Sequence, residues 1–112
     1  MKEKIEFTEF LEIEKKLEII IGQVISAERI PKSTKLIKMR VNFTGEPSED
    51  KSVVTNLGST FEPSDFEGKN FPFITNLIPS TMMGVVSEAM IIVGTDDKTI
   101  ELYNYSIGAK LM

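Results

Sequence analysis

The sequence has 112 residues, of which 41% are hydrophobic, and its formal net charge is −4. A chain of this length holds one hydrophobic core, so we expect a single domain over residues 1–112. The absence of cysteine and histidine excludes disulfides, cysteine metal sites and the commonest general base. The acidic balance argues against phosphate binding by bulk charge, but not against a local basic patch.

The chain also lacks the signals of membrane insertion and secretion. No apolar run approaches the roughly 18 residues of a transmembrane helix. The first 18 residues carry four lysines and six glutamates, which is unlike a signal peptide. We therefore expect a cytoplasmic protein with no membrane partner, and the leading Met and compact ends favour an independent chain.

The N-terminal part predicts one helix followed by a strand. Apolar residues at helical spacing predict a helix over residues 7–13, within a helical segment at about 5–14, and Thr8 is a candidate cap. The density of isoleucine and valine predicts a strand over residues 17–30. Gly22 within it suggests a bulge or a tight barrel bend.

The middle of the chain predicts three more strands. Residues 35–43 alternate between apolar and polar side chains, as in a half-buried strand. Residues 44–51 have the composition of a loop, and a short strand follows over 52–57. Residues 62–68 predict a helical turn, because proline suits its start and glycine its end. The fourth strand is expected over 70–77.

Residues 76–90 predict a strand end, a turn after Pro79 and a hinge at Gly84, which leads into a fifth strand over 85–93. A turn at 96–98 and a short strand over 99–103 follow. Five short strands with one helical turn between the third and fourth predict an all-β Greek-key barrel of the OB type. The barrel would span about 17–94, followed by a C-terminal extension over 95–112; a generic β-sandwich is the alternative.

The first candidate site is a basic stretch, since residues 29–40 contain no acid. The OB fold binds oligonucleotides on the second strand and the loop before it, where these cations are expected. The candidate RNA-binding residues here are Lys32, Lys35, Lys38 and Arg40, next to Arg29. Alternatively, the alternating lysines only mark the solvated face of a strand.

Two further candidates lie in residues 76–90. Asn76 can read a base edge, and Ser87 and Met90 can line the same groove. Alternatively, Asn76 caps a strand end and Met90 belongs to the core. Thr81, Met82 and Met83 form an apolar knuckle that can contact a peptide, a base or a partner, or can simply pack under its own loop.

Catalysis is not expected. The acidic groups near 46–50 and 96–97 lack calcium-loop spacing and are most simply solvated turns. The sequence shows no paired nucleophile and base, no phosphate-binding glycine loop and no metal-ligand spacing. We expect no catalytic residue, no metal and no cofactor.

Five segments, 17–24, 30–36, 53–57, 61–69 and 76–90, resemble in order the tRNA-binding OB-fold domain. That domain is appended to some methionyl- and tyrosyl-tRNA synthetases and also occurs as free-standing proteins. The strongest matches are Asn76-Leu77-x-Pro79 and Gly84-Val85-x-Ser87-x-Ala89-Met90. The resemblance implies recognition of tRNA by shape, with Lys35, Asn76, Ser87 and Met90 as groove residues. It also implies a homodimer joined through its terminal segments, which would cover the apolar face of the helix.

The sequence departs from the family in the knuckle. The family usually has Lys-Pro-x-Lys-x-Arg-Gly there, whereas this chain has the uncharged Ile78, Thr81 and Met83. The leading hypothesis is a non-catalytic tRNA-binding module that assists an aminoacyl-tRNA synthetase in trans or within a complex. The uncharged knuckle keeps two alternatives open: a CsaA-like homodimeric peptide-binding chaperone, and a protein–protein adaptor that has lost RNA binding.

Overall fold

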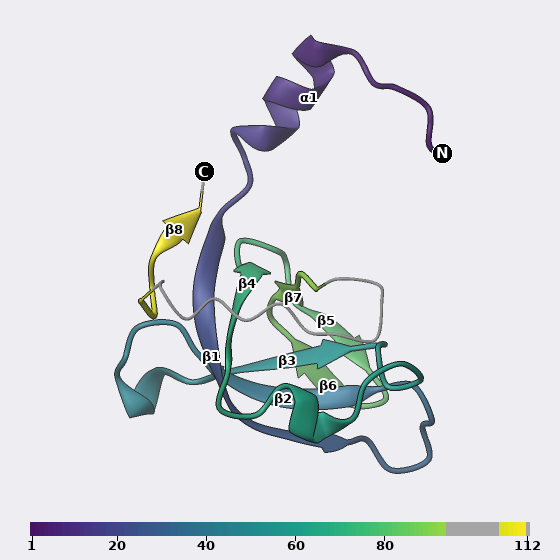
Figure 1. Cartoon of the computed structure of the whole chain (residues 1–112), viewed down its shortest axis with the longest axis vertical. Coiled ribbons are helices and arrows are strands. Elements are labelled where there is room, and N and C mark those ends of the chain that lie inside the picture. Colours follow the sequence, from purple (N-terminus) through teal and green to yellow (C-terminus); the bar gives the residue numbers. More distant parts are fainter. Residues whose placement is uncertain (94–105, 112) are drawn as a thin grey trace.

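The computed structural model describes residues 1–93 and 106–111, and it consists mainly of β-strands with one N-terminal helix (Figure 1). The elements are, in chain order, α1 (Phe7–Glu14), β1 (Ile19–Arg29), β2 (Ile37–Asn42), the 3₁₀ turn η1 (Pro47–Glu49), β3 (Lys51–Thr55), the 3₁₀ turn η2 (Pro63–Asp65), β4 (Asn70–Ile74), β5 (Ser80–Met82), β6 (Val85–Ser87), β7 (Met90–Ile91) and β8 (Lys110–Leu111).

The main sheet is antiparallel, in the order β3-β2-β1-β4-β7, and β8 adds to β1. Its two ends meet because the backbone N–H of Glu88 donates to the carbonyl of Ser52 at 2.9 Å. The backbone N–H of Val54 donates to the Ser87 hydroxyl at the same distance. With β6 and β7 acting as one interrupted strand, these contacts make a nearly closed five-stranded barrel. The predicted OB-type fold is confirmed.

Alternation along β2 builds the core. Ile37, Met39 and Val41 are completely buried, whereas Lys38 and Arg40 between them are exposed. This period of two places one face of the strand inside the barrel and the other in solvent. Phenylalanines fill the interior, and pairs such as Phe43–Phe73 pack edge to face at 5.2 Å. Such aromatic pairs add roughly 0.5–1.5 kcal/mol beyond burial.

Strand β1 contains a bulge, but it lies beyond Gly22. The register with β2 shifts between Val24 and Ser26, so Ile25 is the extra residue. Gly22 instead allows close approach: a Cβ there would lie 2.6 Å from the ring of Phe43. The glycine is therefore required by packing rather than by the bulge.

The helix α1 stands away from the barrel (Figure 1), and none of its residues is buried. The prediction of Thr8 as the cap was wrong. The N-cap position is Glu6, without a side-chain cap, and Thr8 lies within the first turn. Residues 1–6 and every helix residue except the half-buried Leu11 are exposed.

The knuckle is a β-hairpin rather than a loop. β5 and β6 pair antiparallel, and the two residues between them, Met83 and Gly84, both have positive φ, at 49° and 81°. The predicted fifth strand over 85–93 is interrupted at residues 88–89, where the chain turns to bond with β3. The fourth strand ends at Ile74 instead of residue 77, because the next two residues bind the segment before β1.

Other boundaries shift by one or two residues, and the predicted helical turn is η2, where Pro63 is the first residue. The loop over 44–51 contains η1. In the C-terminal extension, residues 106–111 lie along β1, and the backbone N–H of Ile21 donates to the carbonyl of Ala109 at 2.9 Å. The predicted turn at 96–98 and strand at 99–103 lie outside the described residues.

Candidate nucleic-acid interface

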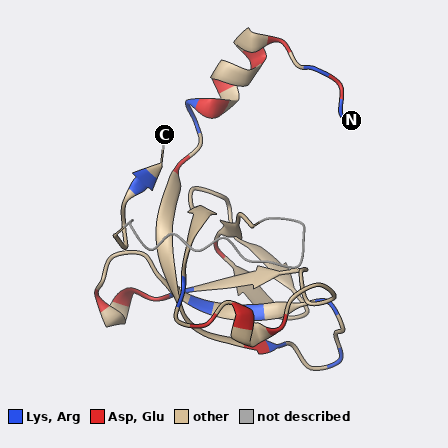
Figure 2. Cartoon of the chain, viewed as in Figure 1, with Lys and Arg blue, Asp and Glu red and all other residues tan. Residues whose placement is uncertain are grey.

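Three lysines near the start of β2 form the main candidate surface, which we call the lysine stripe: Lys32, Lys35 and Lys38. The first two lie in the loop between β1 and β2, and Lys38 is on the outer face of β2. All three are exposed, and their ammonium groups have no ion pair or hydrogen bond with the described residues. Figure 2 shows blue on this loop and strand, while red gathers on α1 and the two 3₁₀ turns. The stripe is therefore a region of free positive charge on an acidic chain.

The two arginines that flank the stripe are held by acids. Arg29 pairs with Glu62 at 3.0 Å and donates to the carbonyl of Gly58 at 2.9 Å, which ties the end of β1 to the segment before η2. Arg40 pairs through Nε with Asp50 at 3.0 Å, yet its side chain remains 58% exposed. Arg29 is thus a structural residue, whereas Arg40 extends the stripe along the same face of β2.

Asn76 lies elsewhere. Its Oδ1 accepts from the backbone N–H of Glu18 at 2.8 Å, and its Nδ2 donates to the carbonyl of Lys16. It thus holds the linker between α1 and β1, at the opposite end of β1 from the lysine stripe. It also lines a cavity of about 310 Å³ with Lys15, Lys16 and Lys110.

The other two groove candidates, Ser87 and Met90, differ in exposure. Ser87 is buried, and its hydroxyl accepts from Val54 N–H at 2.9 Å and donates to the carbonyl of Ala89 at 3.1 Å. These bonds close the barrel. Met90 is 51% exposed, so it is not the core residue that one interpretation of the sequence allowed. It lines an apolar cavity of about 290 Å³ with Leu57 and neighbouring residues of β7.

The hairpin β5–β6 presents an uncharged surface. Residues 70–87 contain no charged side chain. Thr81 and Met83 are exposed and Met82 is half-buried, and Ile78 beside them is 93% exposed. Such a surface favours apolar contacts over phosphates.

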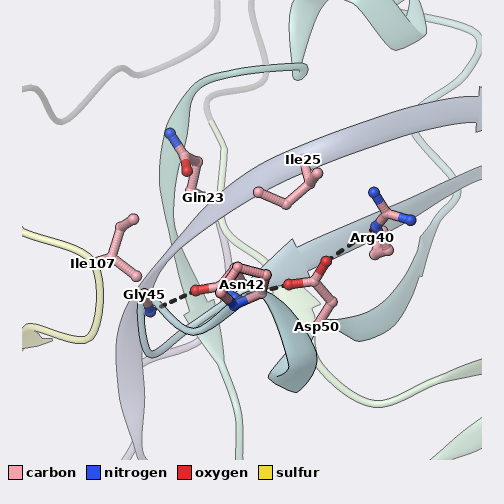
Figure 3. Close-up of a pocket in the computed structure, with 8 residues that line it drawn as sticks. Gln23, Ile25, Arg40, Asn42, Gly45, Asp50 and Ile107 are labelled. Atoms are coloured by element: carbon pink, nitrogen blue, oxygen red, sulfur yellow. Dashed lines mark hydrogen bonds and ion pairs between the residues drawn. The ribbon is translucent and has the colours of Figure 1, made fainter.

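A pocket of about 430 Å³ lies on the outer face of β1 and β2, beneath the 44–50 loop (Figure 3). It is lined by Gln23, Ile25, Arg40, Asn42, Gly45, Pro47, Asp50 and Ile107. Sequence reasoning missed this pocket, because it depends on the bulge at Ile25 and on the tail that carries Ile107. The only local signal is Asn42 before a Thr-Gly turn, since asparagine commonly bonds the backbone of a following turn.

Two features are absent from residues 1–93 and 106–111. No three histidine, cysteine, aspartate or glutamate side chains cluster as they would around a metal ion. Within that same part of the chain, no helix has the length and apolar character needed to span a membrane.

A small antiparallel barrel with exposed cations on its second strand and on the loop before it is typical of the class of oligonucleotide-binding domains. The profile of the family described as "Putative tRNA binding domain" matches residues 19–110. The chain belongs to this tRNA-binding domain family.

The relatives agree with this assignment. Methionine–tRNA ligase of Methanococcoides burtonii is 40% identical over 95 residues, which cover 85% of this chain and 13% of the ligase. The corresponding ligase of Methanoregula boonei is 38% identical, covering 83% of this chain and 14% of that protein. The chain therefore spans about one seventh of the length of these curated relatives.

Solved structures give the same fold. A MetRS-related protein from Pyrococcus horikoshii has a TM-score of 0.76 and 31% identity, and the match covers 99% of this chain and 100% of that one. The chaperone CsaA from Bacillus anthracis has a TM-score of 0.71 over 98% of this chain and 100% of its own, at 22% identity. The CsaA likeness shows the shared fold alone.

Proposed function

We propose that this chain is a non-catalytic, cytoplasmic module that binds tRNA by shape and assists an aminoacyl-tRNA synthetase in trans or within a complex. The observation that carries the proposal is the lysine stripe, because its three cations have no ion pair with residues 1–93 and 106–111 of an acidic chain from a tRNA-binding family. Acids neutralise both flanking arginines in part, yet none pairs with the stripe among the described residues.

The stripe and Arg40 would contact phosphates. Such contacts position a nucleic acid without reading its sequence, which suits recognition by shape. Met90 would add an apolar contact, whereas Asn76 and Ser87 would act by holding the linker and the barrel. Binding of tRNA near a catalytic partner would raise its effective concentration there.

Fluorescence anisotropy with bulk tRNA tests the proposal. If the stripe and Arg40 make four phosphate contacts, affinity should fall about 100-fold between about 50 and 200 mM salt. A Kd near or below about 1 µM at the lower salt, with this steep loss, supports the module. Absence of binding at the lower salt contradicts it.

We further propose that the chain forms a homodimer through α1. Five large apolar side chains on or beside this helix are exposed: Ile5, Phe7, Phe10, Ile13 and Leu17. A second copy would bury them by an isologous contact. Sedimentation should show a dimer for the wild type and a monomer for the double variant Phe10→Glu/Ile13→Glu; a monomeric wild type contradicts this.

A second candidate function is peptide binding in the manner of a chaperone. The observation that favours it is the uncharged hairpin, where Ile78 and Met83 are exposed. Met82→Ser and Met83→Ser should then weaken the binding of apolar peptides, whereas Lys35→Ala should not. The reverse order of effects on tRNA supports the leading proposal.

A further inference from the structure

The pocket beneath the 44–50 loop shares a strand face with the lysine stripe. Lys38, Arg40 and Asn42 alternate along β2 on the outer side, with the stripe at the start of the strand and the pocket at its end. β2 has six residues, so these two regions lie within roughly 20 Å of each other. An RNA strand that contacts the stripe can therefore also reach the pocket.

The pocket has a fixed frame centred on the buried Asn42. Its Oδ1 accepts from the backbone N–H of Gly45 at 2.6 Å, and its Nδ2 donates to the carbonyl of Glu46 at 2.6 Å and to Asp50 Oδ1 at 2.7 Å. Asp50 in turn binds Arg40 through Nε, as the dashed lines in Figure 3 follow. This series of polar contacts holds the 44–50 loop over β2. It leaves the terminal amino groups of Arg40 available to bind an anion.

Two isoleucines supply apolar walls. The bulge leaves Ile25 unpaired and 39% exposed beside the outward-facing Ser26, so two successive residues of β1 lack burial. Bulges commonly re-aim a side chain toward a functional site. Ile107, from the segment that lies along β1, lines the same pocket and is half-buried.

Gln23 brings a polar group that nothing in the described chain uses. It pairs with Asn42 across the strands and therefore faces outward, and its amide forms no hydrogen bond with the described residues. The amide offers a donor beside an acceptor, the arrangement that pairs with the edge of adenine. The pocket volume of about 430 Å³ lies within the range of small-ligand sites.

We propose that this pocket binds one unstacked RNA base, with adenine preferred. The Gln23 amide would read the base edge, Ile25 and Ile107 would contact the base faces, and Arg40 would hold the adjoining phosphate. Protein recognition of RNA commonly targets unstacked bases in this way. This inference rests on the proposed tRNA binding and deepens it, because the stripe alone reads no base.

The test compares Gln23→Leu with Ser80→Leu, which replaces an exposed polar side chain on the β5–β6 hairpin, away from the proposed tRNA contacts. Gln23→Leu should raise the Kd for bulk tRNA about 5- to 10-fold, the loss of one bidentate base contact. Its salt dependence should match the wild type, because no charge is removed. Ile25→Ser should act in the same direction, and Ser80→Leu should change the Kd less than about twofold.

A second measurement uses adenosine 5′-monophosphate and does not depend on tRNA. Gln23 is the only glutamine in the chain, and its side-chain NH₂ signals in an ¹⁵N–¹H spectrum are assigned as the pair that disappears in Gln23→Leu. These signals should shift on titration to about 10 mM nucleotide, as expected for a millimolar site. The same spectrum shows whether each variant is folded.

The outcomes separate the two proposals. If wild-type tRNA binding is strong and salt-dependent but Gln23→Leu binds equally well, the base pocket is overturned and the lysine stripe stands. If the wild type does not bind tRNA, the proposed function fails, and the nucleotide titration then decides the pocket alone. Gln23 signals that do not move overturn it.

Discussion

In the barrel, Phe66, Phe71 and Phe73 are completely buried, whereas α1 carries Phe7 and Phe10 at 70% and 43% exposure. Both regions carry phenylalanines, yet only the barrel buries them. The inward side chains of β2 belong to one buried cluster with residues of β1, β3, β4 and β7, while α1 stands apart from the sheet (Figure 1).

This difference separates what the chain stabilises by itself from what needs a partner. A helix of eight residues is marginal in water, because nucleation is costly and few hydrogen bonds follow. Packing of its apolar face against another surface would supply the missing stability. The barrel has its own core and does not need such a surface.

Core truncation should have the largest effect. Phe71→Ala should destabilise the barrel by about 3–5 kcal/mol, because it removes a fully buried ring and leaves a cavity. Phe7→Ala in α1 should change barrel unfolding by less than about 0.5 kcal/mol. Urea denaturation followed by circular dichroism measures both, and equal losses would contradict the contrast between the two regions.

Barrel closure should give an intermediate effect. Ser87→Ala leaves the buried N–H of Val54 without its partner, at a cost of about 1–3 kcal/mol. The matched control is Ser80→Ala, since Ser80 pairs across the hairpin with Ser87 but is exposed. Thermal unfolding should show a lower Tm for Ser87→Ala alone; a Tm equal to that of the control would mean that Ser87 does not close the barrel.

The hydrogen bonds from Asn76 to the linker should contribute less to stability. Asn76→Ala removes two hydrogen bonds to the exposed linker between α1 and β1, each worth about 0.5–1.5 kcal/mol at most. We expect limited proteolysis to cut residues 15–18 faster while the Tm of the barrel stays close to that of the wild type. An unchanged cleavage rate would show that Asn76 does not restrain the linker.

The smallest effect is expected at the hairpin tip. Met83 has φ of 49°, a left-handed conformation that methionine rarely adopts and asparagine tolerates. Met83→Asn creates the preferred Asn-Gly turn and should stabilise the chain by about 0.5–1 kcal/mol. A Tm that falls would indicate that Met83 makes a packing contact worth more than the relieved strain.

The local sequence pattern predicted much of this fold, because the strands depend on short-range alternation of apolar and polar residues. Alternation from Ile37 to Val41 defined β2 and its exposed lysine, and Pro63 marked η2. The break at Glu88 was not predictable, since it follows from bonding to Ser52, which is 36 residues away.

In the candidate site too, local features were predictable from the sequence and long-range contacts were not. Exposure of Lys38 follows from its place in a strand, but the pairing of Arg29 with Glu62 depends on how the chain returns across the barrel. The pocket at Gln23 depends on the bulge at Ile25, whereas the sequence suggested a bulge or bend at Gly22. Asn76 looked like a base-reading group, and only the folded chain places it on the linker at Lys16 and Glu18.

The most direct test of the central claim measures the salt dependence of tRNA affinity for the triple variant Lys32→Ala/Lys35→Ala/Lys38→Ala. Lys2→Ala/Lys4→Ala is the control, because it also removes cations but from the segment before α1. The account predicts that the slope of log K against log salt flattens by about 2.7 in the triple variant and stays near the wild-type value in the control. A triple variant that binds tRNA with the wild-type affinity and slope would contradict the assignment of the lysine stripe as the tRNA-binding surface.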